Sequence, residues 1–115
     1  MIYCGKNNKQ NDRLTLRDSK KQDIWLHVHN IPGSHTVVAT EGREVPNTTL
    51  EQAAVICAYN SKARDAGQVP VDFTEIRNVK KPQGAKCGMV IYDRYQTVFV
   101  KPDAELVKSL LAEKE

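Results

Sequence analysis

The sequence contains no apolar run near the ~18 residues that a membrane-spanning helix needs. Its first residues form no apolar stretch of the kind found in secretory signals. Glycine and proline are few, at six and five residues, and no repeat, linker or low-complexity tract divides the 115-residue chain. We therefore expect residues 1–115 to form a single globular domain in the cytoplasm, without a membrane partner.

Cysteine is also rare, and Cys4, Cys57 and Cys87 are too widely spaced to make a CxxC pair. This spacing excludes a zinc ribbon and a thioredoxin-like dithiol. It predicts reduced thiols, with Cys57 as a small core residue. The GxxxxGKS/T phosphate loop is absent as well, which disfavours nucleotide hydrolysis. We expect neither a cofactor nor a bound metal.

The formal net charge is only +3, but the charge is unevenly distributed along the chain. Residues 1–21 and 61–101 each carry net +4, whereas residues 22–60 carry net −3 and residues 102–115 net −2. If the two basic blocks fold together, they leave one basic face. Such a face favours a polyanionic partner such as a nucleic acid. The alternative is that a small positive net charge only keeps the protein soluble.

The clearest secondary-structure signal is a strand from Asp23 to His29. Apolar residues alternate along it with polar and aromatic ones, so its two faces differ in chemistry. One face consists of Ile24, Leu26 and Val28, and the other of Asp23, Trp25, His27 and His29. Residues 30–34 are predicted to form a turn, because a Pro-Gly pair suits type II geometry. Residues 35–40 then form a second strand, expected to pair with the first.

Turn and periodicity signals predict the remaining elements. Residues 5–12 are polar and should form a loop, whereas residues 12–21 fit either a strand or a short helix. Thr48 and Glu51 form a capping box that should open a helix, which should end near Asp65 before Gly67. Further along, the patterns predict extended chain over 69–79, a loop over 80–88, a hairpin of 89–92 with 97–101, and a helix over 103–114. The apolar stripe of that last helix is Leu106, Val107, Leu110 and Leu111. The predicted fold class is α+β, a mostly antiparallel sheet covered by two main helices.

The first candidate site is the polar face of the first strand, together with Ser34 and His35 just past the turn. Three readings stay open. His27 and His29, with His35 or Asp23, could ligate a metal. The Trp25 and histidine rings could instead stack on nucleic-acid bases. Alternatively, the aromatic face is a second core that a helix covers.

The second candidate site is the loop KKPQGAKCG at residues 80–88. Its glycines allow close backbone approach to an anion, while Lys80, Lys81 and Lys86 supply positive charge. Lys62, near the end of the predicted helix, adds a further basic group. The alternative is a solvated loop without a ligand, with Lys62 complementing the helix dipole.

The sequence gives little support to catalysis. Ser34 adjoins His35, but neighbours on a strand point to opposite faces and cannot form a dyad. Cys87 adjoins Lys86, although no partner base is placed by spacing. We therefore expect a protein that is not an enzyme.

Six short fragments together resemble the NFACT-R domain, also described as DUF814. They span about residues 3–102 and occur in the family's order. The fragments are Gly5-Lys6-Asn7 with Asn11-Asp12, Asp23-x-Trp25-Leu26-His27, Pro32-Gly33-Ser34-His35, Ala53-Ala54 to Ser61-Lys62, Val71-Asp72-Phe73-Thr74, and Val79-Lys80-Lys81-Pro82-x-Gly84-Ala85-Lys86-x-Gly88. The sequence departs from the family at Cys87, where proline is common.

The resemblance implies RNA binding, because the family is described as the RNA-binding part of larger NFACT proteins that act in ribosome-associated quality control. It implies tRNA or rRNA as the RNA and the ribosome as a further partner. The other domains of those proteins are not in this chain, so their tailing activity is not carried over. The implied RNA-binding residues are Trp25, His27, His29, Ser34, His35, Lys62, Lys80, Lys81 and Lys86. The alternatives are a protein–protein adaptor that docks on a ribosomal or processing factor and, third, a metal-dependent hydrolase.

Overall fold

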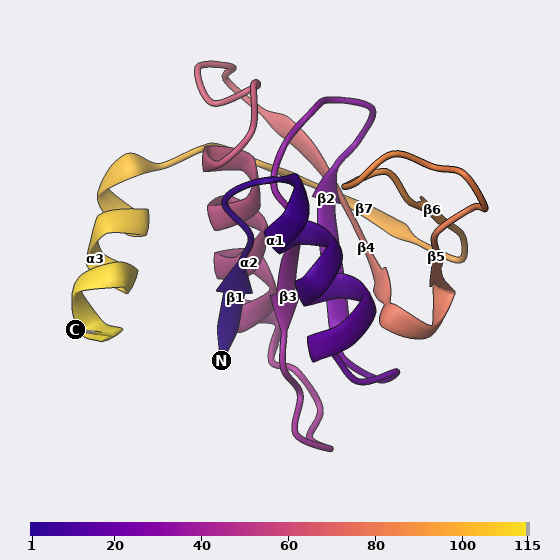
Figure 1. Cartoon of the computed structure of the whole chain (residues 1–115). Helices are drawn as coiled ribbons and strands as arrows, with labels where there is room; N and C mark the ends of the chain where they lie inside the picture. Colours follow the sequence, from indigo (N-terminus) through magenta and orange to yellow (C-terminus); the bar gives the residue numbers. More distant parts are fainter. Residues whose placement is uncertain (115) are drawn as a thin grey trace.

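The structure is a computed structural model that describes the backbone of residues 1–114 and the side chains of residues 1–109. Figure 1 shows an antiparallel sheet of five strands in the order β1-β3-β2-β4-β7, with β5 and β6 paired beside it. The strands are β1 (Ile2–Cys4), β2 (Ile24–Val28), β3 (Thr36–Val38), β4 (Val69–Glu75), β5 (Val79–Lys80), β6 (Ile91–Tyr92) and β7 (Gln96–Val100). The helices are α1 (Asn8–Arg13), which continues into a π-helical turn (Leu14–Asp18), α2 (Asn47–Tyr59) and α3 (Ala104–Lys114), and a 3₁₀ turn (Ile76–Asn78) joins β4 to β5.

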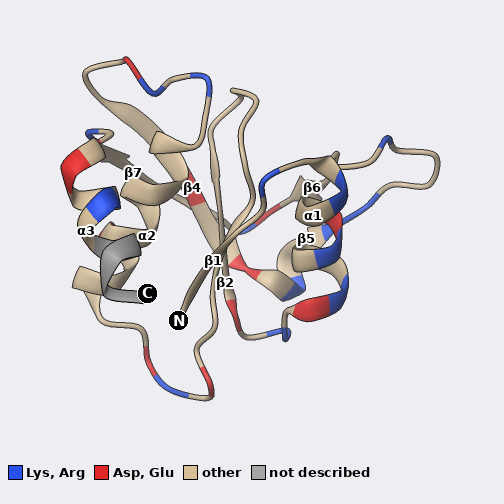
Figure 2. Cartoon of the chain, turned by 60° about the vertical axis from the view of Figure 1, so that its left-hand side comes forward, with Lys and Arg blue, Asp and Glu red and all other residues tan. Residues whose placement is uncertain are grey.

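Helical segments lie on both sides of the sheet. In Figure 2, α2 and α3 lie on one side, while α1 and the β5–β6 pair lie on the other. Every neighbouring pair of strands in the large sheet is antiparallel, so the predicted α+β class is confirmed. Within the part of the chain that is described, no helix is both long enough and apolar enough to cross a membrane.

The first core lies between α2 and the sheet. Its sheet side includes Leu26, Val28 and Val71, all fully buried. Its helix side includes Ala53 and Cys57, which are also fully buried and small enough to let the helix approach the strands closely. Cys57 is the most buried of the three cysteines, as the sequence predicts. This burial raises the pKa of its thiol to about 12.

The predicted capping box at the start of α2 is wrong. The helix begins at Asn47, earlier than Thr48 and Glu51 require, and no side chain caps it. Pro46 precedes the first turn, and its carbonyl accepts a hydrogen bond from the Leu50 amide at 3.1 Å. Pro46 is itself extended, with φ −61° and ψ 147°, as the residue that flanks the first turn of a helix usually is.

The predicted end of α2 near Asp65 is also wrong, because the helix stops at Tyr59. The next residue, Asn60, leaves helical geometry. Its side-chain amide donates to the Ile56 carbonyl at 2.9 Å, and its backbone amide reaches the same carbonyl at 3.1 Å. These two bonds satisfy a carbonyl at the helix end, so no glycine is needed to stop the helix.

The predicted loop over residues 5–12 contains α1 instead. Asn7 caps this helix, because its side-chain oxygen accepts from the Gln10 amide at 2.9 Å. The helix has no apolar stripe and is anchored by a polar contact. Buried Asn11 accepts a hydrogen bond from the backbone amide of His35 at 3.1 Å. Hydrophobic periodicity cannot reveal a helix that docks in this way.

The predicted C-terminal hairpin does not form, since its two strands pair with different partners. Tyr92 on β6 lies opposite Val79 on β5, whereas Val98 on β7 lies opposite Val71 on β4. Between the two strands, Arg94 adopts a positive φ of 51°. The turn therefore passes the chain from the small sheet to the large one.

The predicted last helix is present as α3. The Asp103 side chain accepts from the amides of Glu105 and Leu106 at 3.0 and 3.2 Å, which caps its first turn. Val107 is buried against the first core. Leu110 and Leu111, which the sequence places on the same apolar stripe, lie outside the described side chains.

Candidate nucleic-acid interface

Trp25 forms a second core on the other face of the sheet. Its side chain is fully buried among Val37, Ile76 and Val79, with the Tyr92 ring 4.6 Å away. No face of the indole is open to a base, so Trp25 cannot act as the stacking residue that the sequence suggests. The reading of this face as an aromatic second core covered by a helix is the one that the packing supports.

His35 is buried in the same core and belongs to a hydrogen-bonded chain. The Trp25 indole donates to the Thr15 hydroxyl at 3.2 Å, and that hydroxyl lies 2.7 Å from His35 Nδ1. His35 Nε2 lies 3.2 Å from the Gly88 carbonyl, which can only accept, so Nε2 carries the hydrogen. Thr15 then donates to Nδ1, and every donor in the chain has an acceptor.

Burial holds both inner histidines in the neutral form. It lowers the pKa of His35 to about 4, helped by the neighbouring His27 ring. The pKa of His27 is also lowered by burial. Its ring stacks on Trp25 with 5.7 Å between centroids, and its Nδ1 donates to the Val28 carbonyl at 2.7 Å. Neither histidine can therefore supply a positive charge to a phosphate near neutral pH.

The third histidine occupies a different environment. His29 follows β2, and its Nδ1 lies 2.7 Å from the fully buried carboxylate of Asp72. Its side chain is 39% exposed. Among the described residues, no group of three His, Cys, Asp or Glu side chains is placed so that it could hold a metal ion.

Loop 80–88 reaches His35 through the Gly88 carbonyl and is fixed by Lys81. The Lys81 ammonium donates to Asp12 on α1 at 3.0 Å and to the Lys86 carbonyl at 2.7 Å, with the Met89 carbonyl at 3.5 Å. These acceptors use the three hydrogens of the ammonium group. Lys81 therefore holds the loop in shape and is not available to a phosphate in this arrangement, which corrects its predicted role.

Asp12 completes the connection between α1 and the loop. Its second carboxylate oxygen accepts from the Gly88 amide at 2.9 Å. Burial opposes ionisation of this carboxyl, but Lys81, the Gly88 amide and the Cys87 thiol together outweigh burial, so the pKa of Asp12 lies below its ordinary value. Gly88 itself has φ +86°, and a Cβ there would meet the Asn8 side chain at 2.8 Å. This position consequently requires glycine.

A basic surface results where α1 and loop 80–88 lie side by side. Figure 2 shows lysine and arginine positions on the side of the molecule that carries α1 and β5, away from α2. The basic surface consists of the exposed residues Lys9, Arg13, Lys80 and Lys86. Of these, Arg13 has one acidic neighbour, Asp18, at 3.6 Å, and both groups are exposed, so that pair contributes little.

Ser34 and Lys62 lie at another point, where the turn after β2 meets the end of α2. The Ser34 amide donates to the Asn60 carbonyl at 3.1 Å, and the Lys62 amide donates to the Pro32 carbonyl at 3.1 Å. Lys62 is exposed and Ser34 is half-buried. Ser34 therefore lies in the 30–34 turn and Lys62 lies beside it, and neither belongs to loop 80–88.

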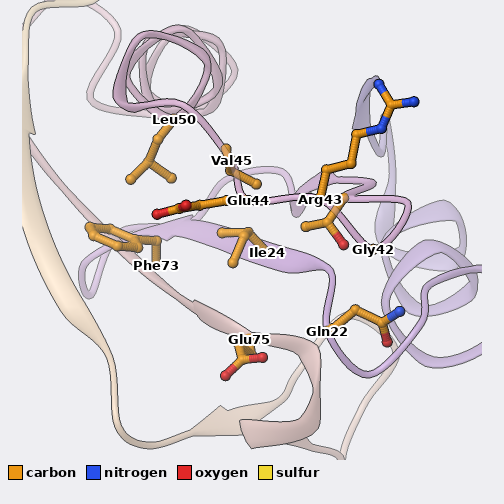
Figure 3. Close-up of a pocket in the computed structure, with 10 residues that line it drawn as sticks. Gln22, Ile24, Gly42, Arg43, Glu44, Val45, Leu50, Phe73 and Glu75 are labelled. Carbon is orange, nitrogen blue, oxygen red and sulfur yellow. The ribbon is translucent and has the colours of Figure 1, made fainter.

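The opposite face of the sheet carries a cavity of about 440 Å³ that differs in chemistry (Figure 3). Ile24, Leu50 and Phe73 give it an apolar floor, and the carboxylates of Glu44 and Glu75 stand at its sides. Its charged lining consists of Glu44, Glu75 and Arg43, so over the apolar floor it offers a phosphate group no net positive charge. The cavity therefore does not extend the basic surface.

Fold and site together define a small α+β domain with a basic surface over a buried tryptophan–histidine core. The family model for the NFACT protein RNA binding domain matches residues 1–93. The chain belongs to this family, and the resemblance identified in the sequence is confirmed.

Known relatives of the chain are considerably longer. It is 54% identical over 109 residues to the Rqc2 homolog RqcH of Bacillus subtilis, and 41% identical over 110 residues to RqcH of Streptococcus suis. These alignments cover 95% and 96% of this chain but 19% and 20% of the relatives. The solved C-terminal part of the Streptococcus suis fibronectin/fibrinogen-binding protein has a TM-score of 0.90 and 42% identity, covering 94% of this chain and 43% of that one. The chain thus spans about a fifth of the length of its curated bacterial relatives.

Several residues that build the site are absent from the sequence-based prediction. Asn11, Asp12 and Thr15 position the histidines and the loop, and Asp72 orients His29. Asn11, Asp12 and Asp72 could have been suspected, because all three lie in fragments that carry the family resemblance. Thr15 lies outside those fragments, in a polar segment whose pattern does not distinguish buried from exposed residues.

Proposed function

We propose that this chain is an RNA-binding module for structured RNA, such as tRNA or rRNA, in translation or ribosome quality control. The single observation that carries the proposal is the basic surface, where two segments far apart in sequence present exposed cations on one side. The family description supports RNA as the partner. The similarity to Rqc2 homologs supports the ribosomal context.

The basic surface is prepared for phosphate binding before RNA arrives. Lys81, held by Asp12, fixes the loop that carries Lys80 and Lys86, so little flexibility is lost when RNA binds. Phosphate contacts of this kind set affinity and orientation without reading sequence. We propose binding without catalysis, because the two inner histidines are neutral and hydrogen-bonded and His35 is also fully buried.

Replacing Lys80 and Lys86 together by alanine should flatten the salt dependence of RNA binding. Each lysine that meets a phosphate releases about one counterion, so the slope of log affinity against log salt should become less negative by about two. The measurement is a titration of labelled tRNA and of an rRNA fragment at several salt concentrations. The loss should be similar for both RNAs.

A matched control removes the same charge elsewhere. Arg43, beside the acidic cavity, and Lys108, on α3, are exposed, and their double alanine variant should keep the original slope. Equal flattening in both double variants would mean that net charge alone, and not this surface, governs binding.

A protein–protein adaptor is the second candidate function, favoured by Met89 and Ile91. These apolar residues follow the basic loop and are both exposed. If the wild-type chain binds neither RNA at low salt, this apolar pair becomes the leading docking surface for a ribosomal or processing factor.

A further inference from the structure

Two partly exposed rings lie together at one end of the sheet, on the face that carries the second core. His29 follows β2, and Tyr95 lies in the turn between β6 and β7. Their ring centroids are 6.2 Å apart, with planes inclined by 36°. The Tyr95 residue is 42% exposed and the His29 side chain 39%. Both rings are therefore accessible, which distinguishes them from Trp25 and His35.

Asp72 fixes the orientation of the His29 ring. Its fully buried carboxylate accepts from His29 Nδ1 at 2.7 Å, from the Tyr92 hydroxyl at 2.5 Å and from the Thr97 hydroxyl at 2.7 Å. Since a carboxylate can only accept, Nδ1 must carry the hydrogen. In the neutral ring Nε2 is then an acceptor, and the exposed Asn30 amide lies 3.1 Å from it.

The turn that carries Tyr95 is also held in place. The Thr74 hydroxyl lies 3.1 Å from the Asp93 carbonyl and 3.3 Å from the Arg94 carbonyl, and it accepts from the Asn78 side chain at 2.9 Å. The Tyr95 ring further packs edge-on against Tyr92, with centroids 5.1 Å apart. A platform fixed in this way loses little entropy when a ligand stacks on it.

We propose that His29 and Tyr95 form a subsite for one unpaired nucleotide of the bound RNA. The base stacks on the Tyr95 ring, and an amine of the base or a ribose 2′-hydroxyl donates to His29 Nε2 in place of the Asn30 amide. Exposed Arg94 lies next to Tyr95 in the chain and supplies a cation for the adjoining phosphate. This inference rests on the proposed RNA-binding function and adds that the RNA must present an unpaired base.

A paired base does not fit this subsite. Within a duplex, the stacking faces are covered by neighbouring base pairs and the hydrogen-bonding edges are occupied. An unpaired base in a loop or bulge offers one free face and free donors. Hairpin and duplex RNA of equal phosphate number should therefore differ at this subsite, whereas the basic surface binds both.

The test compares Tyr95→Ala with Tyr95→Phe, which keeps the ring, and with Tyr3→Ala. Tyr3 is a similarly exposed tyrosine, at 46%, on β1 at the other edge of the sheet. Affinity is measured for an RNA hairpin with an unpaired loop and for a duplex with the same number of phosphates. We expect Tyr95→Ala to weaken hairpin binding about tenfold with an unchanged salt slope, and to leave duplex binding unaltered. Tyr95→Phe and Tyr3→Ala should stay within about twofold of wild type.

The subsite would be overturned if folded Tyr95→Ala kept its hairpin affinity, or if it lost affinity equally for hairpin and duplex. Either result would leave the proposal for the basic surface unaffected. Failure of the wild type to bind either RNA would overturn both proposals. A second measurement uses the wild-type chain alone. Nuclear Overhauser contacts between hairpin base protons and the Tyr95 ring are expected in the complex, and contacts confined to other residues would contradict the assignment.

Discussion

Replacing Trp25 by alanine should lower the free energy of unfolding by ~3–5 kcal/mol, the usual effect of removing a large buried aromatic side chain. The change leaves a cavity beside Val37 and Ile76 and removes the donor that the indole gives to Thr15. Urea denaturation followed by circular dichroism measures the loss. Phe99→Ala is the control, because Phe99 is exposed and its removal should change stability by less than ~1 kcal/mol.

The same variant separates the two readings of the tryptophan face. If Trp25→Ala kept the stability of the wild type and lost only RNA affinity, the indole would have to be accessible to a base. Loss of stability with little change in the affinity of the folded fraction is the result that a core residue gives.

Lowering the pH from neutral towards 4 should destabilise the fold through His35. Its pKa is about 4 in the folded chain, below the ordinary 6.5, because burial disfavours the charged ring. The unfolded chain therefore takes up a proton first as the pH falls. The stabilisation that neutral His35 gives the folded state is fully present above pH 6.5 and is lost as the pH falls through 4. The free energy of unfolding should fall by at most ~3 kcal/mol.

Urea denaturation at a series of pH values from 7.5 to 4 tests this expectation. The control is His35→Gln, which retains an amide for hydrogen bonding and does not titrate. Carboxyl groups such as Asp12 titrate in both proteins, so the difference between the two curves isolates His35. Parallel curves for the wild type and the variant would show that His35 is not the group responsible.

Where local sequence pattern determines structure, the sequence predicts it well. The alternation along β2 correctly separates Leu26 and Val28 from Trp25 and His27, and the small residues of α2 mark the face that meets the sheet. Alternation shows that two faces differ, but it does not show which of them is covered. Trp25 is covered because the polar segment at residues 5–18 folds into helical turns held by the buried side chains of Asn11 and Thr15.

Long-range pairing is the part that the sequence does not reveal. Lys81 resembles a phosphate ligand in the sequence, yet its partner Asp12 lies 69 positions away in the chain. The partners of β6 and β7 are likewise chosen by the whole sheet, whereas a local pattern only suggests that they pair with each other. Lys80 and Lys86 are lysines of the same loop and are exposed, so they stay the proposed phosphate contacts.

The central claim, that RNA binds on the face of α1 and loop 80–88, is tested most directly by mapping amide chemical shifts during an RNA titration. Nuclear magnetic resonance suits a chain of this length, and an RNA hairpin can be added stepwise to the labelled protein. We expect the largest shifts in α1, in loop 80–88 and around Tyr95, with little change near Glu44 and in α3. Shifts concentrated around the acidic cavity, with α1 and the loop unaffected, would contradict the account.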